Sequence, residues 1–308
     1  MPAKQIAVIS GKGGTGKTSL VASFAALAES PVMADCDVDA PDLHLVLRPV
    51  VRETHPFSGG LAARIDPDRC TGCGRCRELC RFGAVEAARA GAWPPGGLAA
   101  FRVDPLACEG CGVCHDHCPE GAVTLERQRA GTWHVSSTRF GPLVHAVLGV
   151  AQENSGKLVA QVRERARELA QERGSPVVIV DGPPGIGCPV ISSITGVDLV
   201  LVCTEPTPSG RHDLDRVLDL ADHFRVPALV CVNKADLGPR VTEEMAARVH
   251  GRGAGFAGTV PYDEAVVEAM MAGRALVERP GALAAPAVVA IWRQVEEALG
   301  LPARRAAG

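Results

Sequence analysis

Short apolar runs alternate with longer segments of helical spacing along most of the chain. The runs are five to eight residues long and end at glycine, aspartate or other polar residues, which indicates buried strands. Between them, segments such as 158–172 and 214–223 repeat apolar positions with the period of a helix. The alternation predicts an α/β fold with a mostly parallel sheet covered by helices. The predicted strands are 5–9, 31–35, 176–181, 197–204 and 226–233.

Two cysteine-rich segments interrupt this alternation. The segment 64–85 recurs 38 positions later as 102–123, with four cysteines of each copy in register. An internal duplication of this kind indicates a separate unit inserted into the α/β domain. We therefore predict an α/β domain in two parts, 1–62 and 128–300, an inserted α+β domain at 63–127 and a disordered tail at 301–308.

Composition excludes several classes of partner. The chain has 308 residues, 46% of them hydrophobic, which is enough for two domains with buried cores. Its net charge of −3 gives no basic surplus, so we expect neither a nucleic-acid nor a membrane partner. No export signal or membrane-spanning run occurs, and we expect a cytoplasmic location. Twelve cysteines in that setting are metal ligands or buried thiols rather than disulfides.

The segment 11–18, GKGGTGKT, fits the phosphate-loop motif G-x-x-x-x-G-K-[ST]. It stands between a predicted strand and the helical segment 18–28, which is the context that the motif needs. Backbone amides of Gly13, Gly14, Thr15 and Gly16 would face phosphate oxygens. Lys17 would neutralise the β- and γ-phosphates, and Thr18 would ligate Mg²⁺. The motif predicts a nucleotide and magnesium site, beside which Lys12 is an additional lysine.

Each copy of the duplicated segment contains the spacing C-x₂-C-x₂-C-x₃-C. In two-cluster ferredoxins the fourth cysteine of each run ligates the other cluster. Zinc is the alternative, because paired C-x₂-C segments also bind Zn²⁺. The ferredoxin rule predicts one [4Fe–4S] cluster on Cys70, Cys73, Cys76 and Cys118, and a second on Cys108, Cys111, Cys114 and Cys80.

The run KGGTGKT resembles the deviant phosphate loop of the MinD/Mrp/ParA group of ATPases, which includes the nitrogenase iron protein. The resemblance covers the chain apart from the insert. It implies ATP hydrolysis by a dimer in which Lys12 reaches the partner's nucleotide. In DCDVDAPDL, Asp37 is similar to the aspartate that orients the attacking water near Mg²⁺. At the end of VIVD, Asp181 is similar to the switch aspartate that holds Mg²⁺ through water.

Two later segments resemble the family's surroundings of the base. In VNKADL, the Asn233 amide is expected to pair with adenine, and in PYD, Pro261 is expected to flank the ring. Cys188 follows Asp181 at the spacing of one cluster ligand of the iron protein, but no cysteine occurs from 119 to 187 to supply the second. We therefore expect a structural thiol there. The remaining cysteines, Cys36, Cys203 and Cys231, lie within or beside apolar strands and are expected to be buried.

The whole pattern resembles the subfamily of MinD-type ATPases with an inserted ferredoxin domain. It implies a Mg-ATP-dependent ATPase, either a homodimer or a heterodimer with a related ATPase. Such a protein would pass electrons through two [4Fe–4S] clusters to a redox protein partner, in redox chemistry or metal-cofactor assembly. One alternative is a scaffold or carrier of iron–sulfur clusters, which the lack of spare ligand cysteines disfavours. The other is a positioning or partition ATPase in which the clusters are structural.

Overall fold

The chain forms two compact units. This computed structural model describes residues 2–88, 101–149 and 155–302. The first unit comprises Met1–His55, Trp133–Val147 and Ser155–Gly308, and the second comprises Pro56–Thr132 and Leu148–Asn154. The division falls a few residues outside the predicted insert, 63–127. From residue 303 onward the predicted tail lies outside the described residues.

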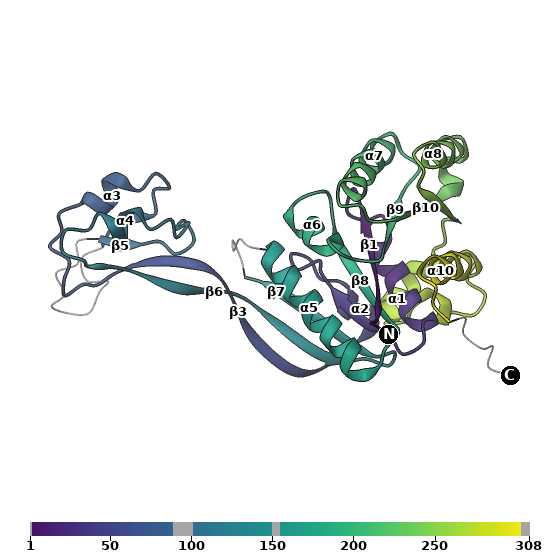
Figure 1. Ribbon diagram of the computed structural model, residues 1–308, viewed down its shortest axis with the longest axis horizontal. Coiled ribbons are helices and arrows are strands. Elements are labelled where there is room, and N and C mark those ends of the chain that lie inside the picture. Colours follow the sequence, from purple (N-terminus) through teal and green to yellow (C-terminus); the bar gives the residue numbers. More distant parts are fainter. Residues whose placement is uncertain (1, 89–100, 150–154, 303–308) are drawn as a thin grey trace. The chain divides into compact units, whose positions relative to one another are not determined.

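The first unit is built on a mostly parallel sheet, as the alternation predicts (Figure 1). In the described part of the chain the strand order is β11-β10-β9-β1-β8-β2-β7-β6-β3. Parallel pairs join β1 to β8 and β9, β2 to β7 and β8, and β10 to β9 and β11. The strands are β1 Lys4–Ser10, β2 Val32–Asp35, β3 Val50–Ile65, β6 Val123–Ser137, β7 Pro142–Leu148, β8 Val177–Pro184, β9 Leu199–Thr204, β10 Ala228–Asn233 and β11 Gly255–Val260.

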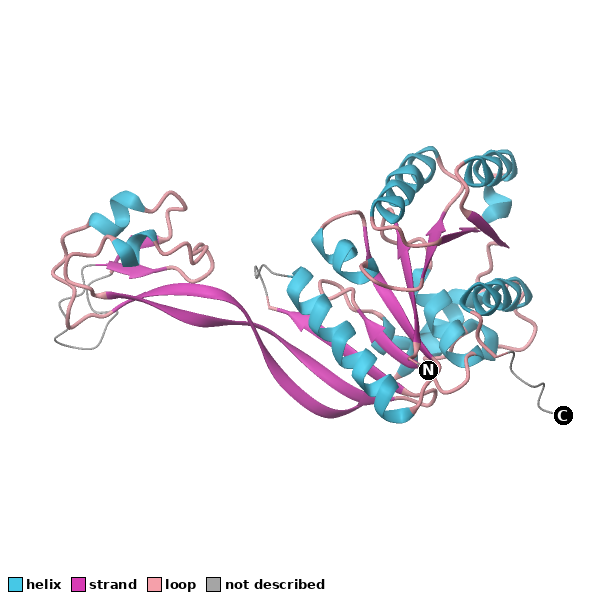
Figure 2. Cartoon of the chain, in the orientation of Figure 1, coloured by secondary structure: helices cyan, strands magenta, loops and turns pink. Residues whose placement is uncertain are grey.

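Helices cover both faces of this sheet (Figure 2). On one face α1 and α10 contact each other, and α10 also packs on β11. On the other face α5 packs on β2 and β8, α6 on β8, and α7 on β9 and β1. The helices of this unit are α1 Lys17–Leu27, α2 Leu43–Leu47, α5 Ser155–Arg173, α6 Cys188–Ile194, α7 Pro208–His223, α8 Pro239–Gly251, α9 Ala265–Ala272 and α10 Ala285–Leu299, with 3₁₀ turns η1 Ala235–Leu237 and η2 Leu276–Glu278.

Alternate residues of the central strands supply the core on each face. Ile6 and Ile179 belong to the cluster that includes Phe24 of α1 and Trp292 of α10. The two rings lie 5.0 Å apart between centroids. The intervening residues, such as Val180, are equally buried. Because successive strand residues point to opposite faces, continuous apolar runs mark strands that are covered on both sides.

The long strands β3 and β6 form an antiparallel ribbon. Arg52 contacts Ser137, Thr54 contacts His134 and Arg64 contacts Glu126, so the strands run in opposite directions. Both strands pass from the first unit into the second, at 55/56 and at 132/133. Most residues of β3 are exposed. The alternation of buried strands and helices therefore gave no sign of this ribbon.

The second unit contains the duplicated cysteine segments. Each copy supplies one short helix, α3 Arg75–Leu79 or α4 Val113–Asp116, and one strand of the antiparallel pair β4 Val85–Ala87 and β5 Phe101–Val103. Glycines at equivalent positions of the two copies, Gly74 and Gly112, precede the helices with φ values of 78° and 83°. Only glycine adopts this left-handed conformation at low cost. The small core of this unit includes Ile65 and Val123, and six of the cysteines pack against it.

Candidate nucleotide site and cysteine cavities

The phosphate loop connects β1 to α1 at the carboxyl end of the parallel strands. Gly14 and Gly16 have left-handed backbone, with φ values of 78° and 90°. A Cβ atom at Gly16 would lie 2.4 Å from Nδ2 of Asn233, so no larger side chain fits unless Asn233 moves. These two glycines let the loop curl against the end of β10. The amides at the start of α1 then face the site, an arrangement that suits phosphate.

A cavity of about 720 Å³ opens beside this loop. That volume lies within the usual range for sites that bind small molecules and cofactors. The structure brings most of the predicted nucleotide residues to its wall. Those residues are Gly13, Gly14, Gly16, Lys17, Thr18, Asp37, Asn233 and Pro261.

Asp181 lies at the end of the apolar part of β8, within reach of the loop. It is 1% exposed, and its Oδ1 atom has no hydrogen-bond partner among the described residues. Burial raises the pKa of Asp181 to about 6, although Lys17 and a hydrogen bond with Thr18 act in the opposite direction. An unpartnered carboxylate oxygen beside Thr18 suits a divalent cation. A bound cation would favour the ionised carboxylate.

Mg²⁺ fits this donor set. Among the described residues, no three His, Cys, Asp or Glu side chains are placed to hold a metal ion. Mg²⁺ does not need such a group, because it is usually bound by one or two protein oxygens together with waters and substrate phosphates. Thr18 and Asp181 supply oxygens of the required kind, and Asp37 lines the neighbouring cavity.

Asp35 organises the segment that carries Asp37. It is completely buried at the end of β2 and accepts hydrogen bonds from the backbone N–H groups of Asp37 (3.2 Å) and Leu43 (3.3 Å). Burial, and then the neighbouring Asp181, raises its pKa well above the usual value. Burial also raises the pKa of Asp37, and Lys17 opposes that rise. Asp37 is therefore positioned by a buried carboxyl group to which sequence analysis assigned no role.

Lys12 does not line the cavity, and within this single chain it forms an ion pair with Glu205. The Lys12 Nζ atom lies 3.0 Å from Glu205 Oε2, and Lys234 Nζ lies 2.5 Å from Oε1 of the same side chain. Burial opposes ionisation of Glu205, but hydrogen bonds from both lysines outweigh it and lower its pKa. Lys234 also contacts the carbonyl oxygen of Gly14 at 3.4 Å. Glu205 and Lys234 were not predicted from the sequence, where they are marked only by their place just after strands β9 and β10.

The side chain of Asn233 supports the phosphate loop. Its Nδ2 atom donates to the carbonyl oxygen of Thr15 at 2.8 Å, and its Oδ1 atom accepts from the N–H of Lys234 at 3.0 Å. An amide nitrogen carries two hydrogens, so one remains for a ligand. Pairing of Asn233 with adenine stays a prediction that would use this second hydrogen. Thr15 is a buried residue of the loop and does not line the cavity.

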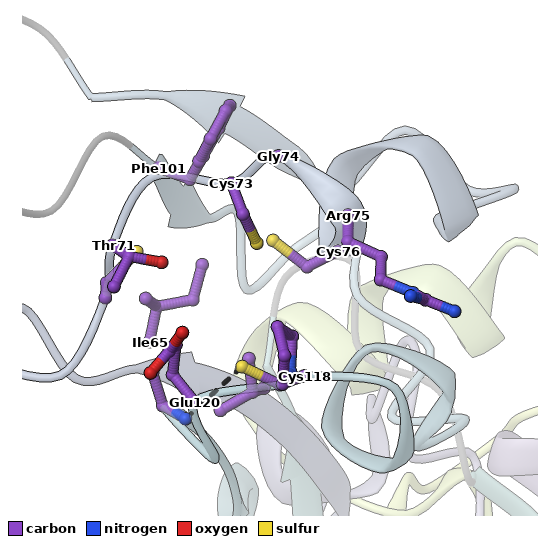
Figure 3. A pocket seen from close by; sticks show the side chains of 13 residues that line it. Ile65, Thr71, Cys73, Gly74, Arg75, Cys76, Phe101, Cys118 and Glu120 are labelled. Atoms are coloured by element: carbon purple, nitrogen blue, oxygen red, sulfur yellow. Dashed lines mark hydrogen bonds between the residues drawn. The ribbon is translucent and has the colours of Figure 1, made fainter.

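In the second unit, eight cysteines line two cavities, four to each. Figure 3 shows the first cavity, into which the sulfur atoms of Cys73, Cys76 and Cys118 point. Its fourth cysteine is Cys70. The second cavity is lined by Cys80, Cys108, Cys111 and Cys114. Each cavity thus combines three cysteines of one copy with the fourth cysteine of the other.

Backbone amides point at two of these sulfur atoms. The N–H of Ala122 donates to Cys118 Sγ at 3.3 Å, and the N–H of Ala63 donates to Cys108 Sγ at 3.4 Å. Burial raises the pKa of Cys76 and of Cys114. A metal would reverse that effect, because coordination deprotonates a thiol. The amide donors would likewise favour thiolates.

The other four cysteines lie in the first unit. Cys36, Cys203 and Cys231 are completely buried, as expected. Cys188 is exposed at the first residue of α6. None of the described helices is long and apolar enough to cross a membrane.

A phosphate loop between the first strand and the first helix, with aspartates at the ends of two neighbouring strands, defines a P-loop nucleotide-binding protein. Residues 6–277 match the family described as the CobQ/CobB/MinD/ParA nucleotide binding domain. The chain belongs to this family, which includes the MinD and ParA ATPases.

Individual proteins and solved structures are also similar to this chain. Protein MJ0578 of Methanocaldococcus jannaschii is 35% identical over 241 residues, covering 75% of this chain and 78% of its own length. The cell division ATPase MinD of Pyrococcus furiosus aligns with a TM-score of 0.57 and 17% identity, over 96% of this chain and 99% of its own. The septum site-determining protein MinD of Pyrococcus horikoshii, solved with Mg-ADP, aligns with a TM-score of 0.56 and 16% identity, over 96% of both chains. At such identities the two structures show the fold alone.

Proposed function

We propose that this protein is a Mg²⁺-dependent ATPase whose second unit binds two [4Fe–4S] clusters and passes electrons to a protein partner. The observation that carries the proposal is the division of eight cysteines between two cavities, four to each, in crossed sets. That crossing is the ligand pattern of two-cluster ferredoxins. The nucleotide site of the first unit would control when the partner is engaged.

The residues of the first unit suit ATP hydrolysis. Lys17 would neutralise the β- and γ-phosphates, and the loop amides would hold their oxygens. Thr18 and Asp181 would hold Mg²⁺, Asp181 directly or through water. Asp37 would orient the attacking water, because it lines the cavity and is held by Asp35. In a homodimer, or a heterodimer with a related ATPase, Lys12 would leave Glu205 to reach the partner's nucleotide.

We expect each set of four cysteines to hold a cluster rather than a single ion. The described residues hold no group placed for one metal ion, although each cavity presents four sulfur atoms. A cubane attaches its thiolates to four separate iron atoms, so its ligands stand further apart than those of a single Zn²⁺. A bound [4Fe–4S] cluster would supply reversible uptake of an electron. The chain would hold it through the four thiolates, and the Ala63 and Ala122 amides would stabilise two of those sulfur atoms.

A positioning or partition ATPase is the second candidate. The comparisons favour it over electron transfer, because the matched family includes MinD and ParA and the aligned structures are cell-division proteins. In that case clusters would be structural or absent. A cluster scaffold or carrier is a third alternative. It would transfer its clusters to an apo-ferredoxin, which an electron carrier would not.

The test of the proposal is the metal content of anaerobically purified protein. Two cubanes predict about eight iron and eight sulfide per chain. Iron near zero, or stoichiometric zinc, would remove the electron-transfer function and leave the positioning ATPase. ATP hydrolysis, measured on the same preparation, tests the nucleotide site independently.

Serine variants test the crossed assignment. Cys70→Ser should damage one cluster and Cys108→Ser the other, so each variant should keep the electron paramagnetic resonance signal that the other loses. Cys118→Ser is the sharper variant, because it lies in the second copy but should damage the same cluster as Cys70→Ser. If Cys118→Ser damages the Cys108 cluster instead, the crossing is wrong. Cys188→Ser, in the first unit, is the matched control and should leave both signals unchanged.

A further inference from the structure

The two copies of the cysteine segment carry opposite charge. Residues 69–81 contain four arginines and one glutamate. The equivalent residues 107–119 contain one glutamate, one aspartate and no arginine or lysine. Val113, His115 and Pro119 stand where the first copy has Arg75, Arg77 and Arg81. Shared cysteines and glycines preserve the local fold of both copies, so that fold does not require the arginines.

These arginines are exposed and free of ion pairs. Arg75, Arg77 and Arg81 all lie at the surface. The ion pairs formed by described residues of the second unit join Arg64 to Glu126 and Arg102 to Glu86, and none includes these three arginines. In the described part of this unit, no salt bridge therefore neutralises the positive charge of these three arginines.

Apolar side chains lie among the charges. Leu79 is 40% exposed and Phe82 is 37% exposed, and the guanidinium of Arg81 lies 4.9 Å from the centroid of the Phe82 ring. Arg75 lines the first cysteine cavity and extends away from it in Figure 3, whereas Phe82 lines the second. The segment 75–82 thus runs along the surface from one cavity to the other. We call it the arginine face.

We propose that the arginine face is the docking surface for an acidic electron-carrier protein, one that presents carboxylates around an apolar centre. This inference rests on the proposed function, because it places the partner beside both cysteine cavities. Complementary charge raises the rate of encounter and fixes orientation, and the two apolar side chains supply contact area. A partner docked on the equivalent part of the second copy would meet Glu109 and Asp116 instead.

A protein fits this surface better than a nucleic acid or an anionic membrane. Polyanions are bound by extended basic surfaces, whereas the chain as a whole has a charge of −3. Three arginines within eight residues, with leucine and phenylalanine between them, match the size of a small protein contact. Transient redox encounters use small interfaces of this kind.

The test uses the full-length protein and flavodoxin, an acidic electron carrier, as the probe. The dissociation constant is measured at 50 and 300 mM NaCl for the wild type and for Arg75→Glu/Arg77→Glu. Arg127→Glu/Arg129→Glu, on exposed positions of β6, changes the net charge equally and is the matched control. We expect the wild type to bind about tenfold more weakly at high salt, because exposed charge pairs are screened. The Arg75/Arg77 variant should bind about tenfold more weakly at 50 mM with little further salt effect, whereas the control should stay within about twofold of the wild type.

Equal losses in the two variants would overturn the arginine face, since net charge alone would then explain binding. An unchanged dissociation constant in the Arg75/Arg77 variant would also overturn the proposal. Binding of single-stranded DNA or of phosphatidylserine vesicles through these arginines, without binding of flavodoxin, would overturn it as well. Arg75→Gln/Arg77→Gln, with an intermediate loss, guards against misfolding of the reversed variant. Iron content is measured on every sample, so absence of clusters, which would refute the proposed function, is distinguished from failure of docking.

Discussion

Lys17 is 6% exposed, and it acts on the two carboxyl groups of the nucleotide site. It lowers the pKa of both Asp37 and Asp181, against burial that raises them. The same side chain thus acts on both aspartates and would also contact the phosphates that the loop would bind. We therefore expect single substitutions at this site to act through the balance of charge between Lys17 and the two aspartates, and not through the shape of the cavity alone.

Replacing Lys17 with alanine should weaken nucleotide binding strongly. Loss of a charge-assisted contact to the phosphates costs about 3 kcal/mol, which weakens binding by roughly 100-fold. Isothermal titration with ATP measures this change. Lys4→Ala is the control, since Lys4 pairs with Asp198 away from the site and should leave affinity unchanged. A Lys17→Ala protein that binds ATP like the wild type would show that the loop does not hold phosphate.

Asp37→Ala should separate hydrolysis from binding. If Asp37 orients the attacking water, the hydrolysis rate should fall by about 100-fold, while ATP affinity changes little. Asp39→Ala is the matched control, because Asp39 lines the same cavity and is exposed. Steady-state phosphate release and nucleotide titration together provide the measurement. Equal rate losses in both variants would argue that general negative charge, not Asp37, supports the reaction.

At the scale of elements, His145 of β7 shows how the sheet buries polar groups beyond the nucleotide site. It is 8% exposed, with Nε2 2.9 Å from the hydroxyl of Ser136 on β6. Burial, then His134 on β6 and His44 on α2, lowers its pKa to about 4 from an ordinary value of 6.5. Its register partner on β2 is Asp35, which is itself buried. The neutral imidazole is therefore built into the sheet.

This lowered pKa makes the stability of the first unit depend on pH. Between pH 6.5 and pH 4 the unfolded chain binds a proton that the folded His145 does not, so stability is present above pH 6.5 and is lost as the pH falls. The full effect is about 3 kcal/mol. Chemical denaturation of the wild type and of His145→Gln from pH 8 to pH 4 measures it. We expect a shallower pH dependence in the variant, and parallel curves would contradict this account of His145.

The sequence predicted most of the strands that are covered on both faces, but it missed β7, whose residues 143–146 are buried. Continuous apolar runs marked β1, β2, β8, β9 and β10, because burial on both sides leaves no polar positions. The ribbon of β3 and β6 was missed, since most residues of β3 are exposed, β6 mixes buried and exposed residues, and neither strand follows a clear pattern. Helix α6 was also missed, because seven residues are too few to establish helical periodicity.

The functional sites were likewise predicted only in part. Spacing alone identified the phosphate loop, because its motif is contiguous in sequence. Glu205 could not be found in that way, since its partners Lys12 and Lys234 are distant in the chain and meet only when strands are placed side by side. The charge difference between the cysteine copies was readable from the sequence, but its meaning depended on exposure and on the positions of the cavities.

At the scale of the whole molecule, the chain leaves the first unit between two parts of the nucleotide site. The ribbon strand β3 begins shortly after the segment that carries Asp37, and the chain returns through β7 and α5 to β8 and Asp181. Across the sheet, Asp181, Asp35 and His145 are register partners on β8, β2 and β7. A row of buried polar residues therefore runs from the nucleotide site to the strand beside the ribbon. If nucleotide affects the second unit, as the proposed function requires, we expect the effect to begin in this row of residues.

Coupling of this kind must be reciprocal. If ATP binding changes the reduction potential of a cluster, reduction must change the affinity for ATP by the same free energy. A nucleotide that interacts equally with both redox states would shift nothing. Typical couplings of about 1–3 kcal/mol correspond to roughly 40–130 mV for a one-electron centre. Such shifts are large enough to measure.

The most direct test of an ATPase that governs electron transfer is a redox titration of the clusters in three nucleotide states. The anaerobic full-length protein is titrated without nucleotide, with Mg-ADP and with a non-hydrolysable Mg-ATP analogue, and each cluster is followed by electron paramagnetic resonance. Lys17→Ala serves as the control that should not respond to nucleotide. We predict that the potential of at least one cluster differs between the ADP and ATP-analogue states by several tens of millivolts. Identical potentials in all three states, with partner reduction rates also unchanged, would contradict the coupling and leave the clusters as structural parts of a positioning ATPase.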